Sequence, residues 1–317
     1  MIQSAVDAAG PQAARIAALW WLMFWALAAV FVLVMVALGW ALVHRRRSIA
    51  AVGYEPLGRV ERRMGVAVGV AVGGTVVILL VLLVVSVSTG RSLSALRSHD
   101  PLTIEVTGRQ WWWEVQYDAS LPSERVTTAN EIRIPVGRPV LVKLRSPDVI
   151  HSFWVPNLHG KRDLIPGLVN SIWLQADRAG VFRAQCAEYC GLQHAHMALA
   201  VVAEEPAAFE AWLAAQRQPA PEPADDLARR GRDVFLAGSC VMCHRIRGTD
   251  AGATAGPDLT HVASRLTLAA GTLPNSVGNL AGWILDPQAI KPGTQMPANS
   301  FAPDDLQALL AYLGSLR

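Results

Sequence analysis

Two long apolar runs dominate the first third of the chain. No charged residue occurs over Ile16–Val43, a run of 28 residues, or over Met64–Gly90, a run of 27. About 20 apolar residues are enough for a helix to cross the hydrocarbon core of a bilayer. Both runs also exceed the apolar part of a cleaved signal peptide. The pattern therefore predicts transmembrane helices over residues 16–43 and 64–90, forming a hairpin within residues 1–100.

Arginines are distributed unevenly around these runs. The connection between them carries Arg45, Arg46, Arg47, Arg59, Arg62 and Arg63. The outer flanks carry only Arg15, Arg91 and Arg97. Because basic loops stay in the cytoplasm, we expect the connection to be cytoplasmic and both outer ends to be periplasmic. The chain is accordingly expected to be a multi-pass protein of a bacterial plasma membrane.

From Leu102 onward the pattern changes to short runs in which apolar and polar residues alternate. The runs are LTIEVTG, WWWEVQY, EIRIPVG, PVLVKLRS, NSIWLQA, GVFRAQC and MALAVVAE. Alternation of this kind, with Gly, Pro, Asp and Asn between the runs, is typical of half-buried strands. We therefore expect residues 101–203 to form an all-β domain, an antiparallel Greek-key barrel.

Helical and linker patterns follow the barrel. PAAFEAWLAAQ predicts a short helix, and the Pro- and Ala-rich QRQPAPEPADD at 216–226 predicts a semi-rigid extended spacer. Residues 204–226 would thus connect the barrel to an all-α domain at 227–317. Such a tether makes any transfer between the two domains intramolecular.

Composition agrees with a membrane protein. Hydrophobic residues make up 52% of the 317 residues, which is too many for one soluble domain of this length. The formal net charge of +3 comes from the arginines around the apolar runs. It therefore reflects membrane topology, and we expect no nucleic-acid partner.

The segment CAEYCGLQHAHM at residues 186–197 combines two thiols, Cys186 and Cys190, with the His194 imidazole and the Met197 thioether. Soft sulfur donors mixed with imidazole favour copper over hard cations. A mononuclear blue-copper site uses one cysteine, so the second thiol suggests two copper ions sharing bridging sulfurs.

Other interpretations of this segment remain. Cys186 and Cys190 could form a disulfide in an oxidising compartment, but that leaves His194 and Met197 without a role. A Cys2His2 zinc site would use the thiols and two imidazoles, but not Met197. His196 has no place in the pattern, and we expect it at the surface.

CVMCH at residues 240–244 is the attachment sequence of c-type haem. Cys240 and Cys243 would form thioethers with the haem vinyl groups, and His244 would be the proximal iron ligand. A helical pattern precedes the motif, and Gly-Pro-Asp-Leu follows it at 256–259. A disulfide or a thioredoxin-like pair is the alternative, and the adjacent His244 argues against both.

The sixth iron ligand is predicted by elimination. Only Met242 and Met296 are available in the C-terminal segment, and Met242 lies inside the attachment loop. Met296, in the Gly/Pro-rich KPGTQMPAN, would complete a Met/His pair suited to electron transfer. His261 is the competing candidate.

The copper segment, together with HSFWVP upstream, resembles the dinuclear CuA site of cytochrome c oxidase subunit II. With the fused haem domain, the chain resembles the caa3 type of that family. The resemblance implies a cupredoxin fold and a class I cytochrome c domain. It implies that the copper ligands are His151, Cys186, the Glu188 carbonyl, Cys190, His194 and Met197.

The family implies further roles. Trp111, which we expect to share a strand face with Trp113, would accept electrons above CuA, although core packing would also explain these tryptophans. Glu61 would mark a proton-channel entrance, or would be an ordinary acidic residue near a helix N-terminus. The Glu188 carboxylate would reach a magnesium ion at the subunit I boundary.

As a subunit of a proton-translocating oxidase, the chain would pass electrons from an external cytochrome c or other donor through haem c and CuA to subunit I. Subunits I and III would be its partners, and it has no oxygen-reducing site of its own. Two alternatives remain: a nitric or nitrous oxide reductase component, and a membrane-tethered electron carrier. Nitrous oxide reductases usually replace the Glu188 position and lack the hairpin.

Overall fold

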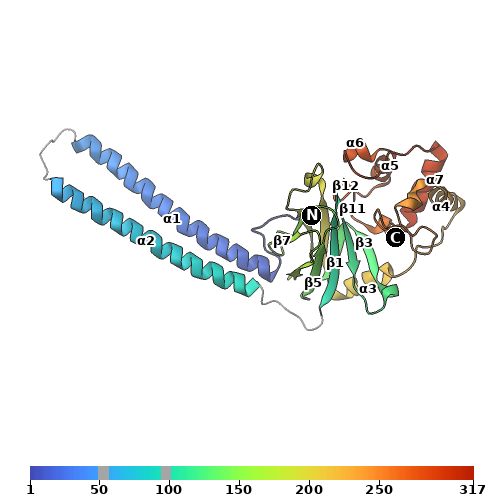
Figure 1. Ribbon diagram of the computed structural model, residues 1–317, viewed down its shortest axis with the longest axis horizontal. Coiled ribbons are helices and arrows are strands. Elements are labelled where there is room, and N and C mark those ends of the chain that lie inside the picture. Colours follow the sequence, from blue (N-terminus) through green and yellow to red (C-terminus); the bar gives the residue numbers. More distant parts are fainter. Residues whose placement is uncertain (49–56, 94–100) are drawn as a thin grey trace. The chain divides into compact units, whose positions relative to one another are not determined.

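The structure is a computed structural model that describes residues 1–48, 57–93 and 101–317 (Figure 1). Arg97 lies outside the described residues, as do the side chains of Arg45, Arg46, Arg47 and Arg59. The chain divides into two compact units, one of Arg15–Leu96 and one of Met1–Ala14 with Arg97–Arg317.

The first unit consists of the two predicted helices, α1 (Pro11–Ser48) and α2 (Leu57–Leu93). Both continue beyond the apolar runs at each end. Within them, Pro11–His44 and Glu61–Leu93 are long and apolar enough to cross a membrane. Their large apolar side chains are exposed along the helices, with Leu33 68% and Val70 70% accessible. Apolar surface on this scale requires lipid or protein around it.

The described part of the second unit includes an all-β domain of ten strands. They are β1 (Leu102–Arg109), β2 (Trp112–Tyr117), β3 (Val126–Ala129), β4 (Glu131–Pro135), β5 (Val140–Arg145), β6 (His151–Trp154), β7 (Lys161–Leu164), β8 (Asn170–Leu174), β9 (Gly180–Cys186) and β10 (Ala198–Glu204). They form two five-stranded sheets, in the orders β3-β2-β1-β5-β8 and β4-β10-β9-β6-β7. We call this cupredoxin-like β-sandwich, visible in green to yellow in Figure 1, the sandwich.

The all-β prediction is confirmed, with one difference in strand direction. β1 pairs with β5 in parallel, and β10 pairs with β4 in parallel, while the remaining pairs within the two sheets are antiparallel. The expectation that the strands pair in an antiparallel way was therefore wrong for these two pairs. Alternation gives the faces of a strand but not the direction of its neighbour.

The alternating residues meet in one core between the sheets. β1 and β2 bury every second side chain, including Trp113 and Tyr117. The Tyr117 hydroxyl donates to the Arg133 carbonyl (2.9 Å) and accepts from the Arg133 amide (2.6 Å), which joins the two sheets. Helix α3 (Pro206–Gln216), as predicted, packs Phe209 and Trp212 against Tyr117.

The N-terminal segment lies with the sandwich. The Ile2 amide donates to the Val181 carbonyl and the Ile2 carbonyl accepts from the Arg183 amide, each at 2.8 Å, beside β9. Asp7 forms an ion pair with Arg178 at 2.9 Å. Ile2 thus forms an isolated bridge to Phe182 of β9, and these contacts hold the N-terminal segment on the sandwich.

The remaining chain forms a helical domain, residues 226–317, here called the C-terminal domain. Its elements are α4 (Asp226–Ala237), β11 (Thr267–Leu268), β12 (Leu273–Pro274), α5 (Val277–Leu285), α6 (Pro287–Ile290) and α7 (Pro303–Ser315), with short 3₁₀ turns at Ser239–Met242 and Val262–Ser264. α4 and α7 cross closely at Gly231, where an added Cβ would lie 1.9 Å from the Ala308 carbonyl oxygen.

The predicted spacer is bound along the C-terminal domain. The Ala220 amide donates to the Arg247 carbonyl (2.9 Å), and a ring nitrogen of His261 lies 3.2 Å from the Gln218 carbonyl. The Arg247 guanidinium also donates to the Arg217 carbonyl. The stretch after α3 is thus held in place on the domain that it precedes.

Candidate metal and haem centres

The copper loop, residues 186–197, connects β9 and β10, as expected from the sequence. Cys186 is the last residue of β9, and its amide donates to the Met197 carbonyl (2.9 Å), which closes the loop. Gly191 takes a φ of +111°, a conformation that side chains disfavour. Both thiols of this folded loop, Cys186 and Cys190, are buried.

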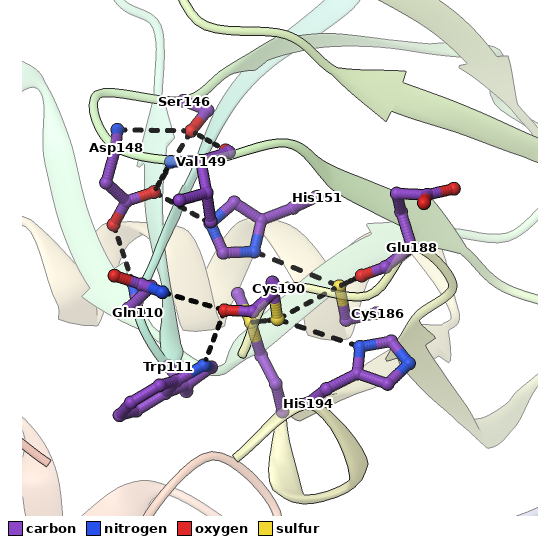
Figure 2. A network of polar contacts seen from close by, with 11 residues as sticks. Gln110, Trp111, Ser146, Asp148, Val149, His151, Cys186, Glu188, Cys190 and His194 are labelled. Atoms are coloured by element: carbon purple, nitrogen blue, oxygen red, sulfur yellow. Dashed lines mark hydrogen bonds and ion pairs between the residues drawn. The ribbon is translucent and has the colours of Figure 1, made fainter. Parts of the chain in front are cut away.

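The sulfur and nitrogen donors meet in one cluster, which Figure 2 shows from close by. The two thiol sulfurs, Cys186 Sγ and Cys190 Sγ, lie 3.8 Å apart. Cys186 Sγ lies 3.8 Å from His151 Nδ1, and Cys190 Sγ lies 3.6 Å from His194 Nδ1. Each thiol thus has its own imidazole.

Two weaker donors complete the cluster. The Glu188 carbonyl oxygen lies 3.2 Å from Cys186 Sγ, and Met197 Sδ lies 3.8 Å from Cys190 Sγ. The His151, Cys186 and Cys190 donor atoms all lie within 4.8 Å of one another, and the three residues are buried. The structure therefore brings together all six residues that the resemblance assigns to copper.

These contacts also bear on the alternatives. The sulfur separation of 3.8 Å is well beyond the roughly 2.05 Å of a disulfide, and both thiols are free. Met197 is 1% exposed and faces Cys190, where a zinc site would give it no role. His196 is exposed, as expected.

Asp148 orients His151 from behind. Its carboxylate accepts from His151 Nε2 at 2.8 Å, so the neutral imidazole presents an unprotonated Nδ1 to the thiols. Burial alone would raise the pKa of Asp148, but hydrogen bonds from His151 and from the Val149 and Gln110 amides lower it to about 2. Burial alone would lower the pKa of His151, but its bonds to Asp148 and Cys186 raise it.

The two thiols share charge. The hydrogen bond from Cys190 lowers the pKa of Cys186, and the same interaction raises the pKa of Cys190. Without a cation between them, two thiolates at this distance repel each other. A soft cation removes that repulsion, so the donor set fits copper.

Trp111 contacts the copper loop directly. Its indole nitrogen donates to the Cys190 carbonyl at 2.9 Å, and it is 8% exposed. The expectation that Trp111 lies in a strand was wrong, because β2 begins at Trp112 and Trp111 belongs to the preceding turn. Trp111 and Trp113 are nevertheless both buried, whereas Trp112 is partly exposed.

Gln110 and Asp148 were missed in the sequence. The Gln110 side chain donates to the Cys190 carbonyl (2.8 Å), while its amide donates to Asp148 (2.7 Å). Figure 2 shows this chain of contacts running from Trp111 round to His151. The only signals were proximity: Gln110 precedes Trp111, and Asp148 stands three residues before His151.

Glu188 and Glu61 are both exposed. The Glu188 carboxylate points away from the sulfurs in Figure 2, while its carbonyl faces them. Glu61 lies near the start of α2, among side chains that are themselves exposed. Among the contacts of the described residues, none brings either carboxylate to a second polar group that would define its role.

The haem motif has the geometry that a c-type haem needs. Cys240 and Cys243 are free thiols; Cys240 is half-buried and Cys243 is exposed. His244 Nδ1 lies 2.7 Å from the Pro257 carbonyl, which fixes the ring and leaves Nε2 for iron. At Gly256 an added Cβ would lie 2.7 Å from the His244 ring, so only glycine fits behind it. The residues present therefore fit covalent haem.

Met296 and His261 differ in availability. Met296 is half-buried in a loop whose carbonyls at Thr294 and Met296 accept from the Gln288 amide (2.7 and 2.9 Å). His261 has one ring nitrogen 2.8 Å from the Arg317 carbonyl and the other 3.2 Å from the Gln218 carbonyl. Because both ring nitrogens of His261 face backbone oxygens, its side chain is the less available of the two candidates.

The apolar helix pair, the cupredoxin-like sandwich with soft donors and the c-type haem motif define a membrane-bound electron-transfer protein. The family model for cytochrome c oxidase subunit II, periplasmic domain, matches residues 102–204, and that for cytochrome c matches residues 228–317. The chain belongs to the cytochrome c oxidase subunit 2 family, with a fused C-terminal cytochrome c domain as in the caa3 type.

Relatives agree along most of the chain. Cytochrome c oxidase subunit 2 of Alkalihalophilus pseudofirmus is 42% identical over 248 residues, 76% of this chain and 70% of that protein. The subunit of Bacillus sp. strain PS3 is 31% identical over 261 residues, 76% and 72% of the two chains. The periplasmic domain of subunit II of cytochrome oxidase from Bradyrhizobium japonicum is 31% identical, with a TM-score of 0.36, covering 38% of this chain and 97% of that domain.

Family membership carries several properties. The chain is a component of a haem–copper oxidase, which is an oxidoreductase, and subunit I is its partner. The two matched domains imply a copper centre and a haem c. With its two apolar helices, it is a membrane protein with a periplasmic domain.

Proposed function

We propose that this chain carries electrons from an external donor, through a covalent haem c and a dinuclear CuA centre, to subunit I. There oxygen is reduced to water, coupled to proton pumping. One observation carries the proposal: the Cys186 and Cys190 sulfurs lie 3.8 Å apart, each beside its own imidazole. A mononuclear site has no use for the second thiol.

The residues that would hold the copper pair share one property, that each presents a soft or neutral donor to the buried cluster. They are His151, Cys186, the Glu188 carbonyl, Cys190, His194 and Met197. When bound, the copper pair supplies a centre that accepts and gives one electron. The protein fixes the donors on β6, β9 and the copper loop. It excludes water from His151, which is 0% exposed, and from both thiols, which are 3% exposed.

In the C-terminal domain, Cys240 and Cys243 would form the thioether bonds to the haem, while His244 and Met296 would be its iron ligands. A Met/His pair raises the iron potential and suits electron transfer. The Pro257 carbonyl keeps His244 aligned. Gln288 holds the backbone of the loop that presents Met296.

Trp111 is the residue that we propose to receive electrons for CuA. Its indole N–H bonds to the carbonyl of Cys190, itself a proposed ligand, at 2.9 Å. The contact leaves no solvent gap between the ring and the copper loop. The route thus passes from indole to backbone to thiolate.

The remaining proposals concern the membrane and the neighbouring subunits. The arginines between the helices favour a cytoplasmic connection and a periplasmic sandwich in a two-span topology. Subunit III and an external cytochrome c would complete the partners. We assign Glu61 to a proton-channel entrance, and the exposed Glu188 carboxylate to a magnesium ion at the subunit I boundary.

The proposal is tested by isolating the chain from its native membrane through an affinity tag. We expect a large many-helix haem–copper subunit to copurify, and the complex to consume oxygen when its haem c is reduced. Isolation of the chain alone, from membranes that contain the rest of the oxidase, would contradict the proposed electron route.

A further inference from the structure

Lys291 is a buried lysine that has no role in the proposed copper or haem site. It follows α6 in the C-terminal domain and is 2% exposed. Its Nζ donates to three backbone carbonyls: Trp111 at 2.8 Å, His196 at 2.9 Å and Ala269 at 3.2 Å. Two of these carbonyls belong to the sandwich and its copper loop, and one belongs to the C-terminal domain. We call these three bonds the Lys291 contact.

The Lys291 contact satisfies every hydrogen-bond donor of the buried ammonium group. An ammonium group has three N–H donors and no acceptor, and here each donor has one carbonyl. Among the residues that the structure describes, no carboxylate forms an ion pair with Lys291. Burial lowers the pKa of Lys291 to about 7, so the site costs free energy that its carbonyls must offset. Lysine side chains without a structural role are usually exposed to water, whereas Lys291 is buried.

Neighbouring contacts join the same two domains. The Gln193 side chain donates to the Pro292 carbonyl at 2.8 Å. Gly293 faces the copper loop and the indole, since an added Cβ would lie 3.1 Å from Leu192 and 3.7 Å from Trp111. Residues 291–293 therefore contact both the copper loop and Trp111.

A second segment of the C-terminal domain rests on the sandwich. The Ala198 amide donates to the Ala270 carbonyl (3.0 Å), and the Leu266 amide donates to the Glu131 carboxylate (2.9 Å). Residues 266–271 and 291–293 together form the interdomain contact. Lys291 is the only charged residue in these two segments. Its ammonium group bonds to two carbonyl oxygens of the sandwich and its copper loop, those of Trp111 and His196.

We infer that Lys291 is a positioning residue that locks the C-terminal domain onto Trp111 and the copper loop, and so sets the rate of electron transfer from haem c to CuA. The inference rests on the proposed function for its electron-transfer consequence. The lock acts on the backbone of Trp111, the residue whose indole bonds to Cys190. It also lies in the segment that leads directly to Met296.

One consequence concerns the electron donor. Trp111 is 8% exposed, and Gly293 of the C-terminal domain covers its ring. A diffusing cytochrome therefore does not reach Trp111 while the Lys291 contact is formed. Its electrons pass through the fused haem first.

The test compares the purified whole oxidase with a Lys291→Met variant, which keeps the side-chain length and removes the donors. Lys143→Met is the matched control, since Lys143 is 40% exposed on β5. The first readout is hydrogen exchange at the Ala198 and Leu266 amides, which bond across the interface. We expect exchange about tenfold or more faster in Lys291→Met, because each lost bond to a charged group weakens docking by at least this factor.

The second readout is the rate of intramolecular electron transfer from haem c to CuA after flash reduction. We expect it to fall about tenfold or more in Lys291→Met, with the spectra of both centres unchanged, and to keep its wild-type value in Lys143→Met. Gln193→Ala weakens the same interface from the copper loop and, like Lys291→Met, should speed hydrogen exchange and slow electron transfer. It provides the test if Lys291→Met does not fold.

Wild-type exchange and transfer rates in Lys291→Met or Gln193→Ala, with both spectra intact, would overturn the inference and leave the proposed function standing. Absence of the copper and haem c spectra from the wild-type oxidase would instead overturn the proposed function. The two failures are therefore distinguishable in one set of samples.

Discussion

At the scale of the residue, the Asp148 carboxylate holds the copper cluster in position. It accepts from His151 Nε2 and from the Gln110 amide, so it ties a proposed ligand to the turn that carries Trp111. Groups that hold a metal-binding histidine in this way typically contribute 10–100-fold to metal affinity. The ligand cluster is thus only as well ordered as the residues behind it.

Removing Asp148 should weaken copper binding. Asp148→Ala leaves His151 Nε2 without its acceptor and frees the ring to rotate, so we expect copper affinity to fall about 10–100-fold. Competition with a copper chelator measures the change. Asp118→Ala, which removes an exposed carboxylate of the same sandwich, should bind copper as the wild type does. Equal affinity in both variants would contradict the role of Asp148.

His159 predicts a pH dependence of stability. Burial lowers its pKa to about 4, and its Nδ1 accepts from the Gly160 amide, so the folded protein holds the neutral ring. Because the unfolded chain has a pKa of about 6.5, the unfolded state binds the extra proton between pH 6.5 and 4. The folded state is therefore fully favoured above pH 6.5 and loses up to about 3 kcal/mol as pH falls to 4.

Urea unfolding of the chain in detergent, followed by tryptophan fluorescence, measures this dependence. His159→Asn keeps an acceptor for the Gly160 amide and removes the titration, so its free energy of unfolding should fall less between pH 6.5 and 4. The exposed His196, changed to Gln, should leave the wild-type dependence in place. If the free energy of unfolding fell equally with pH in His159→Asn and in the wild type, the pH dependence would not come from His159.

At the scale of the element, the pattern of apolar residues predicts much of the fold. Both membrane helices, α3 and seven of the ten strands of the sandwich correspond to runs in the sequence. β7, KRDL, was not predicted because its first three residues are exposed and no alternation exists. β3 and β6 have four residues each, which is too short for an alternating pattern to be recognised in the sequence.

The crossing of α4 and α7 makes a prediction about the C-terminal domain. Gly231→Ala places a methyl group 1.9 Å from the Ala308 carbonyl oxygen and forces the helices apart. We expect a loss of about 1–3 kcal/mol in the free energy of unfolding of this domain, measured by denaturant titration of the haem spectrum.

Gly314→Ala on α7 is the matched control, since nothing lies within 4 Å of the added Cβ. It should stabilise the helix by up to about 1 kcal/mol, because alanine favours helices over glycine. Equal stability of the two variants would mean that the close crossing does not limit the domain.

The whole molecule adds what no local pattern contains. The donor types at 186–197 and 240–244 point to copper and haem because those motifs are local in sequence. Lys291 and Trp111 are 180 residues apart, and their contact depends on how two domains meet. Trp111 itself was misplaced in a strand, because the alternation of the three tryptophans continues into a turn that the sequence does not mark.

The bound linker changes the expected mode of electron delivery. A free spacer would supply the haem domain at about millimolar effective concentration and let it visit the copper loop. Here residues 217–220 are fixed to the C-terminal domain, and that domain contacts the copper loop through Lys291 and Gln193. The electron transfer that we propose within the chain would then depend on one docked arrangement of the two domains rather than on repeated encounters.

The dinuclear copper centre is the central claim, and the optical and electron paramagnetic resonance spectra of the purified oxidase test it most directly. The paired thiols predict a mixed-valence signal from two coppers sharing one unpaired electron, beside the spectrum of a low-spin c-type haem with histidine and methionine ligands. The signal of a single blue copper, with the electron confined to one ion, would contradict the account.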